Sequence, residues 1–98
     1  MNDDLIRKGS IIEMPPDIKK AENSLRLAES KIKHAQESLD NSSYDDAFIS
    51  AYTAMFHCAR ALLFKDGFKE RNHYALYEYL QDNYQDKIER QKNTNFVR

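Results

Sequence analysis

The stretch YDDAFISAYTAMFHCARALLFK, residues 44–65, decides the fold class of this chain. Apolar residues fill most of its positions, and neither glycine nor proline interrupts it. Two aspartates in its first turn complement the positive end of a helix dipole, and Gly67 just beyond it is typical of a helix C-cap. We therefore predict one helix over this stretch. Because its apolar residues cover most of the circumference, we expect a central helix, centred on Met55 and packed on several sides.

A polar stripe interrupts this apolar surface. Its five residues recur at steps of 4, 3, 4 and 3 positions and so share one helix face: Asp46, Ser50, Thr53, His57 and Arg60. In one interpretation Ser50, Thr53, His57 and Arg60 bind a ligand, and in the other the stripe is only the water-facing edge. The planar, permanently charged group of Arg60 suits a phosphate or a carboxylate. A salt bridge from Arg60 to an acid on an adjacent helix is an equally good explanation.

The segment before this helix has a heptad pattern. Its apolar residues alternate steps of 3 and 4 positions: Ile18, Ala21, Leu25, Ala28, Ile32, Ala35 and Leu39. This spacing predicts a long helix with one apolar seam. Three heptads are near the lower limit for a free coiled coil, so we expect a helix of an antiparallel bundle. Prolines at positions 15 and 16 fit the approach to such a helix.

The remaining segments complete an all-α fold. Residues 1–16 are expected to form an N-terminal arm or a short helix, and residues 66–72 a linker. A further helix is predicted over residues 73–83, where apolar residues recur at helical spacing. We therefore predict a single domain, residues 1–98, built as an antiparallel bundle of four to five helices.

Two other residues, His73 and Cys58, are considered as an anion-binding residue and as a nucleophile. His73 follows two basic residues, Lys69 and Arg71, at the start of a predicted helix, which is an anion site in principle. The alternative is that Asn72 caps this helix and His73 is a partly exposed residue of its first turn. Cys58 is predicted to be a small buried apolar residue rather than a nucleophile.

The composition excludes several classes of protein. With 15 Lys and Arg against 16 Asp and Glu, the net charge of −1 disfavours a generic cationic coat for nucleic acid. One cysteine forms no internal disulfide, and three scattered histidines predict no metal site. No apolar run approaches the roughly 18 residues of a membrane span. We expect a cytoplasmic protein with no cofactor and no membrane contact.

The stretch from Tyr44 to Leu63, YDDAFISAYTAMFHCARALL, resembles the central helix of HEPN domains (higher eukaryote and prokaryote nucleotide-binding). In that family an alanine-rich helix ends in Ala-Arg-Ala-Leu, which matches residues 59–62. A glycine and then a histidine that begins the next helix follow there, as Gly67 and His73 do here. The resemblance covers roughly residues 5–84 and includes the heptad-patterned helix, which is similar to the first long helix of the family.

The resemblance implies a helical bundle that is often dimeric. Some members of the family cleave RNA, some are non-catalytic partners of small nucleotidyltransferases in toxin–antitoxin-type pairs, and others bind nucleotides. We therefore expect a homodimeric, non-catalytic binding module that contacts a nucleotide or RNA phosphate or a partner protein of this kind. Arg60 would hold the anion or a partner carboxylate, and His73 would lie nearby as a donor.

The ribonuclease members of the family carry an Arg, then four to six residues, then a His, near the final helix. His34, His57 and His73 have no Arg at that spacing before them. The alternative function is therefore a metal-independent ribonuclease whose motif lies beyond Arg98, with the final helix incomplete at that point. Its catalytic residues stay unassigned.

Overall fold

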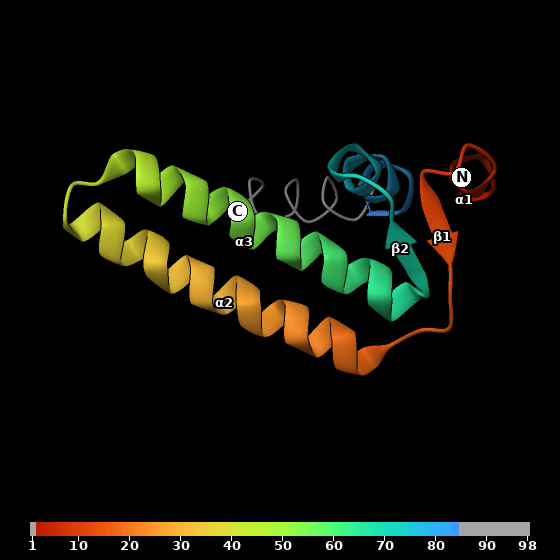
Figure 1. Ribbon diagram of the computed structural model, residues 1–98, viewed down its shortest axis with the longest axis horizontal. Coiled ribbons are helices and arrows are strands. Elements are labelled where there is room, and N and C mark those ends of the chain that lie inside the picture. Colours follow the sequence, from red (N-terminus) through yellow and green to blue (C-terminus); the bar gives the residue numbers. More distant parts are fainter. Residues whose placement is uncertain (1, 85–98) are drawn as a thin grey trace, which may run out of the picture.

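The computed structural model describes residues 2–84, and its centre is a hairpin of two long antiparallel helices (Figure 1). α2 spans Ile18–Asp40 and α3 spans Tyr44–Asp66, which confirms the two long helices predicted from the sequence. α2 begins after Asp17, whose side chain accepts a hydrogen bond of 3.0 Å from the backbone N–H of Lys20. α3 ends at Gly67, whose φ of 92° lies in the left-handed region that favours glycine.

Small side chains make the contact between α2 and α3. The buried residues along this contact are Ala21, Ser24, Ala28 and Ser38 on α2 and Ala47, Ser50, Ala54 and Ala61 on α3. Such small residues let two helix axes approach closely. The larger members of the α2 seam therefore lie outside the contact and stay about half exposed, at 57, 46, 56 and 49%: Ile18, Leu25, Ile32 and Leu39.

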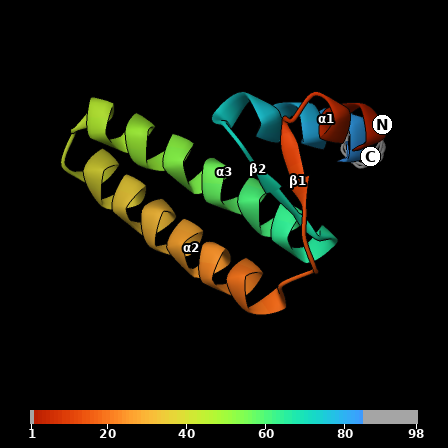
Figure 2. The ribbon, with the colours of Figure 1, turned by 45° about the vertical axis from the view of Figure 1, so that its right-hand side comes forward.

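A second layer covers one end of the hairpin. α1, which spans Asn2–Arg7, and a helix over residues 73–84 run across the hairpin beside the second half of α3 (Figures 1 and 2). The main core lies between this layer and α3 and consists of Leu5, Ile11, Ala59, Leu63, Ala75, Leu76 and Tyr79. The fold is thus an all-α bundle with four helices among the described residues.

A small antiparallel sheet lies beside this core, where the sequence predicted only an arm and a linker. β1 spans Ile11–Glu13 and pairs with β2, which spans Phe68–Glu70. Three-residue strands are too short to show an alternating pattern in a sequence. The pairing depends on Gly67, which accepts a hydrogen bond of 3.0 Å from the backbone N–H of Met14. A Cβ atom on Gly67 would lie 2.8 Å from the carbonyl oxygen of Met14, so only glycine fits there.

The expectation that α3 is packed on several sides holds for its second half and is wrong for its first half. Leu63 and Phe64 are buried, whereas Tyr44, Phe48 and Met55 are 66, 72 and 65% exposed. The reason is that, within residues 2–84, α2 is the main neighbour of the first half, because α1 and the helix of residues 73–84 pack towards the opposite end (Figure 1). That helix contacts the first half through a 2.8 Å hydrogen bond between the hydroxyls of Tyr77 and Tyr52. The predicted final helix and the apolar residues Phe96 and Val97 lie outside the described residues.

α3 is also the one helix among residues 2–84 that is long and apolar enough to cross a membrane, judged by length and composition. A core helix of a soluble protein meets the same criterion, so this property alone is weak support for a membrane span. The side of α3 that faces α2 and the core accounts for part of its apolar character.

Candidate functional site

The predicted polar stripe on α3 does not line one open groove. Ser50 is only 6% exposed and lies in the contact with α2. Thr53 is partly buried, and its hydroxyl donates a 2.8 Å hydrogen bond to the carbonyl oxygen of Ile49 in its own helix. Asp46 at the start of the stripe is exposed. Of the candidate binding residues, the structure therefore brings together only those from the second half of the stripe.

Arg60 is paired with an acid that sequence reasoning missed. Its Nε atom lies 3.0 Å from Oε2 of Glu70 on β2, and the guanidinium sits over the rings of Phe56 and Phe64 at 5.7 and 5.4 Å from their centroids. The Glu70 side chain is only 9% exposed, so the pair is shielded from water on its acidic side. Glu70 reaches Arg60 because β2 pairs with β1, and no local signal in the sequence announces that pairing.

His57 lies beside this ion pair. Burial lowers the pKa of His57, and the nearby positive charges of Arg60 and Lys31 lower it further, so the ring is neutral at pH 7. Its Nδ1 atom is buried and makes no hydrogen bond within the described part of the chain. A neutral imidazole next to an arginine that is already paired carries little net charge with which to attract an anion.

His73 joins the same region through an aromatic contact. Its side chain is exposed, and its ring lies 4.2 Å from the ring of Phe56, which also contacts His57 at 5.6 Å. Asn72 caps the helix that follows, since its Oδ1 atom accepts a 2.9 Å hydrogen bond from the backbone N–H of Ala75. The capping role predicted as the alternative for Asn72 is therefore confirmed.

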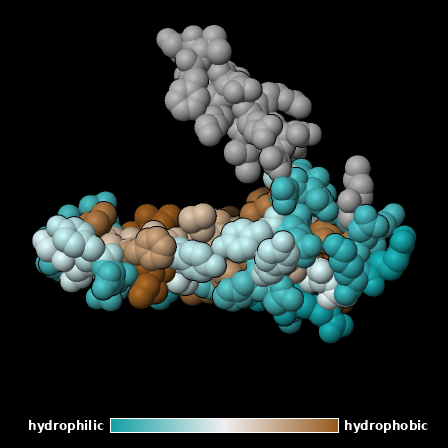
Figure 3. All heavy atoms as spheres, turned by 90° about the horizontal axis from the view of Figure 1, so that it is seen from above, coloured by the Kyte–Doolittle hydropathy of each residue, from teal (hydrophilic) through white to brown (hydrophobic). Residues whose placement is uncertain are grey.

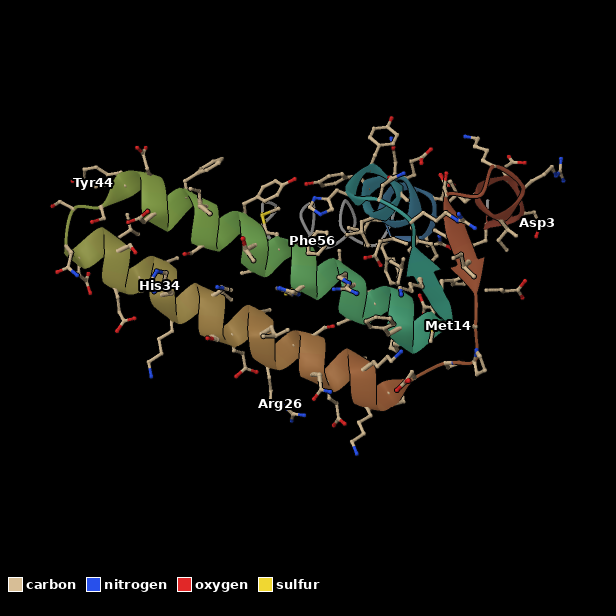
Figure 4. All side chains as sticks on the ribbon, in the orientation of Figure 1. Asp3, Met14, Arg26, His34, Tyr44 and Phe56 are labelled. Carbon is tan, nitrogen blue, oxygen red and sulfur yellow. The ribbon has the colours of Figure 1, made fainter. Side chains whose placement is uncertain are left out.

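Phe56, which links the two histidines, lies on α3 well away from Tyr44 at the loop end (Figure 4).

An apolar surface extends further over the hairpin than the cluster around Arg60. We call it the apolar face and define it by Ile18, Leu25, Ile32 and Leu39 on α2 and by Phe48, Met55, Cys58 and Leu62 on α3. It runs along one side of the hairpin. Figure 3 shows hydrophobic side chains gathered over the half of the hairpin towards the loop, while the end with α1 and the strands is hydrophilic. Contiguous exposed apolar surfaces of this kind mark interaction sites.

Two hollows make this face continuous. The larger has a volume of about 610 Å³ and lies between Ile32, Leu39 and Met55, with Leu80 and Tyr84 of the helix of residues 73–84 on its border. The smaller, about 230 Å³, lies between Ile18, Leu25 and Lys65. Cys58 and Leu62 border both hollows. The prediction that Cys58 is buried is wrong: its side chain is exposed between the two hollows, because no third helix within residues 2–84 covers this side of α3.

Among residues 2–84, no group of three His, Cys, Asp or Glu side chains is arranged to hold a metal ion. The described site thus consists of a paired arginine with two histidines, and beside it a long apolar face. A bundle with this arrangement of helices belongs to the class of small all-α domains.

The comparison with known protein families identifies the family to which the chain belongs. The HEPN domain family matches residues 21–98, which is most of the sequence, and the chain belongs to this family. It is therefore a helical module of a nucleotide- and RNA-binding family. No curated protein and no solved structure matches the chain.

Proposed function

We propose that the chain is a non-catalytic HEPN module that works by binding protein, with the apolar face as the binding surface and a second copy of the chain as the partner. The observation that carries this proposal is the apolar surface on one side of the hairpin, where seven of the eight residues of the apolar face are exposed and Leu62 is partly buried. Monomeric proteins rarely expose such a surface, since burying it in a partner is favourable by about 25 cal/mol per Å².

The size of the face supports a stable complex. Each helix has 23 residues, which corresponds to a length of about 35 Å at 1.5 Å per residue. Two helices side by side over that length offer a surface of the order of the 800 Å² per partner found in stable interfaces. Phe48 and Met55 on the face are of residue types enriched in the cores of interfaces.

The phosphate-binding and ribonuclease interpretations have less support in the described residues. Arg60 lies against Glu70, so a phosphate would have to displace a carboxylate that is 91% buried. The lowered pKa of His57 keeps its ring mainly neutral at pH 7, and its buried Nδ1 atom has no hydrogen-bond partner among the described residues. A ligand would therefore have to rearrange this cluster before Arg60 could bind it.

Leu25 and Leu27, two positions apart on α2, provide a matched test of whether the apolar face mediates self-association. Leu25 borders the smaller hollow of the apolar face, whereas Leu27 lies off the face; they are 46 and 49% exposed. We expect Leu25→Glu to weaken self-association at least about tenfold, because it places a charge in the interface, and Leu27→Glu to leave it unchanged. Sedimentation equilibrium over a concentration series measures both.

A second variant, Met55→Glu, tests the α3 side of the face and should weaken the dimer in the same way, while the helical circular dichroism signal stays unchanged. The proposal is wrong if the wild-type chain is a monomer at every concentration up to the millimolar range. It is also wrong if the variants at positions 25 and 27 lower the association constant equally.

A further inference from the structure

We infer that Glu70 masks a phosphate-binding site at Arg60: its carboxylate occupies the place that a phosphate group takes once the Glu70 side chain turns away. Two anions, one from the chain and one from a ligand, then compete for a single guanidinium. This site is independent of the proposed function, because neither residue borders the hollows of the apolar face. It keeps Arg60 closed to small phosphate-bearing ligands until the contact with Glu70 is released.

The contact between Arg60 and Glu70 is incompletely satisfied. Nε of Arg60 lies 3.0 Å from Oε2 of Glu70, but its N–H is not aimed so as to form a hydrogen bond with that oxygen. The other carboxylate oxygen, Oε1, is buried and has no hydrogen-bond partner among the described residues. A buried pair that serves stability alone normally has its polar atoms satisfied, since unsatisfied ones are costly. The burial of Glu70 therefore overstates how firmly its carboxylate is held.

The Arg60 guanidinium has supports that do not depend on Glu70. Its Cζ atom lies 5.7 Å from the ring centroid of Phe56 and 5.4 Å from that of Phe64, and both rings belong to α3. These cation–π contacts hold the guanidinium from its own helix and persist when the carboxylate leaves. The Arg60 side chain is 28% exposed, so a ligand in solution reaches it. Its planar fork then suits the oxygens of a phosphate.

Further positive charge lies around the Arg60 guanidinium. Nζ of Lys20 lies 5.7 Å from the centroid of a ring that the guanidinium also contacts. Lys31 lies close enough to His57 to lower its pKa, as Arg60 does. Within residues 2–84 neither lysine side chain forms an ion pair, and the carboxylate of Asp17 caps α2 through the backbone N–H of Lys20. Once the masking carboxylate turns away, a phosphate therefore meets several cations.

The backbone beside Glu70 is fastened on both sides. The carbonyl oxygen of Gly67 accepts a hydrogen bond from the N–H of Met14, and the N–H of Arg71 donates one to the carbonyl oxygen of Ser10, both at 3.0 Å. Because these bonds hold β2 against β1, release of the guanidinium needs a rotation of the Glu70 side chain and leaves the strands paired. The fold stays intact while the site opens.

Inorganic pyrophosphate is the probe, and isothermal titration calorimetry at an ionic strength held constant with sodium chloride measures its affinity. We expect Glu70→Gln to bind it at least about tenfold more tightly than the wild-type chain, because a mask that is closed most of the time lowers the apparent affinity in proportion. Glu78→Gln is the matched control, since it removes the same charge from a glutamate that pairs with Lys8 at 3.6 Å, and it should leave the affinity unchanged. Glu70→Asp keeps the charge but draws the carboxylate back by one methylene, so it should also raise the affinity.

Circular dichroism verifies the fold of each variant. Equal affinities of Glu70→Gln and Glu78→Gln overturn the mask and make the carboxylate a structural partner of Arg60. Tight binding that survives Arg60→Gln in the Glu70→Gln chain overturns it too, because pyrophosphate then binds elsewhere. If Glu70→Gln does not fold, Glu70→Asp decides: an affinity equal to that of the wild-type chain, or loss of the fold here as well, overturns the mask.

Discussion

The two halves of α3 have similar apolar sequences and opposite surroundings. In the second half Leu63 and Phe64 are 0 and 5% exposed, whereas in the first half Phe48 and Met55 are 72 and 65% exposed. Both halves meet α2 through small residues, so α2 does not cause the difference. Among the described residues, the difference comes from α1 and the helix of residues 73–84, which pack mainly on the second half and contact the first half through the hydrogen bond between Tyr77 and Tyr52. An apolar circumference therefore shows that a helix needs neighbours, but not which of its parts residues 2–84 cover.

The largest expected effect compares two apolar residues on these two halves. Leu63→Ala removes a fully buried side chain from the main core and should lower the free energy of unfolding by about 3 kcal/mol. Ile49→Ala changes a side chain that is 61% exposed and should lower it by less than about 0.5 kcal/mol. Urea unfolding of both variants at a concentration where the chain is monomeric measures the two values. Equal losses would show that the first half of α3 is buried in solution.

Much of the fold follows from the sequence, because the signals for its helices are local. The periodic apolar residues and Gly67 predict both long helices nearly to the residue, and the spacing after position 73 predicts the next one. Residue types alone do not predict the two strands, because their pairing joins segments more than 50 residues apart. For the same reason the partner of Arg60 could not be named in advance. A salt bridge to some acid was foreseen as an alternative, but Glu70 reaches Arg60 only through that pairing.

The next effect concerns the carboxylates at the two ends of α3. Asp66 accepts hydrogen bonds of 2.6 Å from the hydroxyls of both Tyr79 and Tyr84, which fastens the helix of residues 73–84 to α3. Asp66→Asn should lower the free energy of unfolding by about 2 kcal/mol, because an amide is a weaker acceptor for two donors. Asp45→Asn, at the exposed end, should cost only a few tenths of a kcal/mol. Thermal unfolding compares the two variants, and a larger loss at position 45 would contradict this ranking.

The same cluster gives stability a dependence on pH at both extremes. Burial acts to raise the pKa of Asp66, but hydrogen bonds from Tyr79 and Tyr84 and the charge of Lys65 outweigh it, so the folded pKa lies below 3.8. Its stabilising contribution is therefore complete above about pH 4 and is lost as the pH falls through the folded pKa. Burial and the bond to Asp66 raise the pKa of both tyrosines above 10, so their contribution is lost as the pH rises beyond that value. The stability difference between wild type and Asp66→Asn should shrink in acid, which urea unfolding at pH 3 and pH 7 measures.

The smallest effect compares two asparagines at helix ends. Asn72 caps the helix of residues 73–84 through its side chain, whereas Asn41 caps α2 through its backbone N–H. Asn72→Ala should therefore lower the free energy of unfolding by about 1 kcal/mol, and Asn41→Ala by much less. Because that helix borders the apolar face, Asn72→Ala should also weaken the dimer slightly, while Asn41→Ala should not. Unfolding and sedimentation of the same two variants test both statements, and a loss of dimer with Asn41→Ala alone would point to the loop, not this helix, as the part that meets the partner.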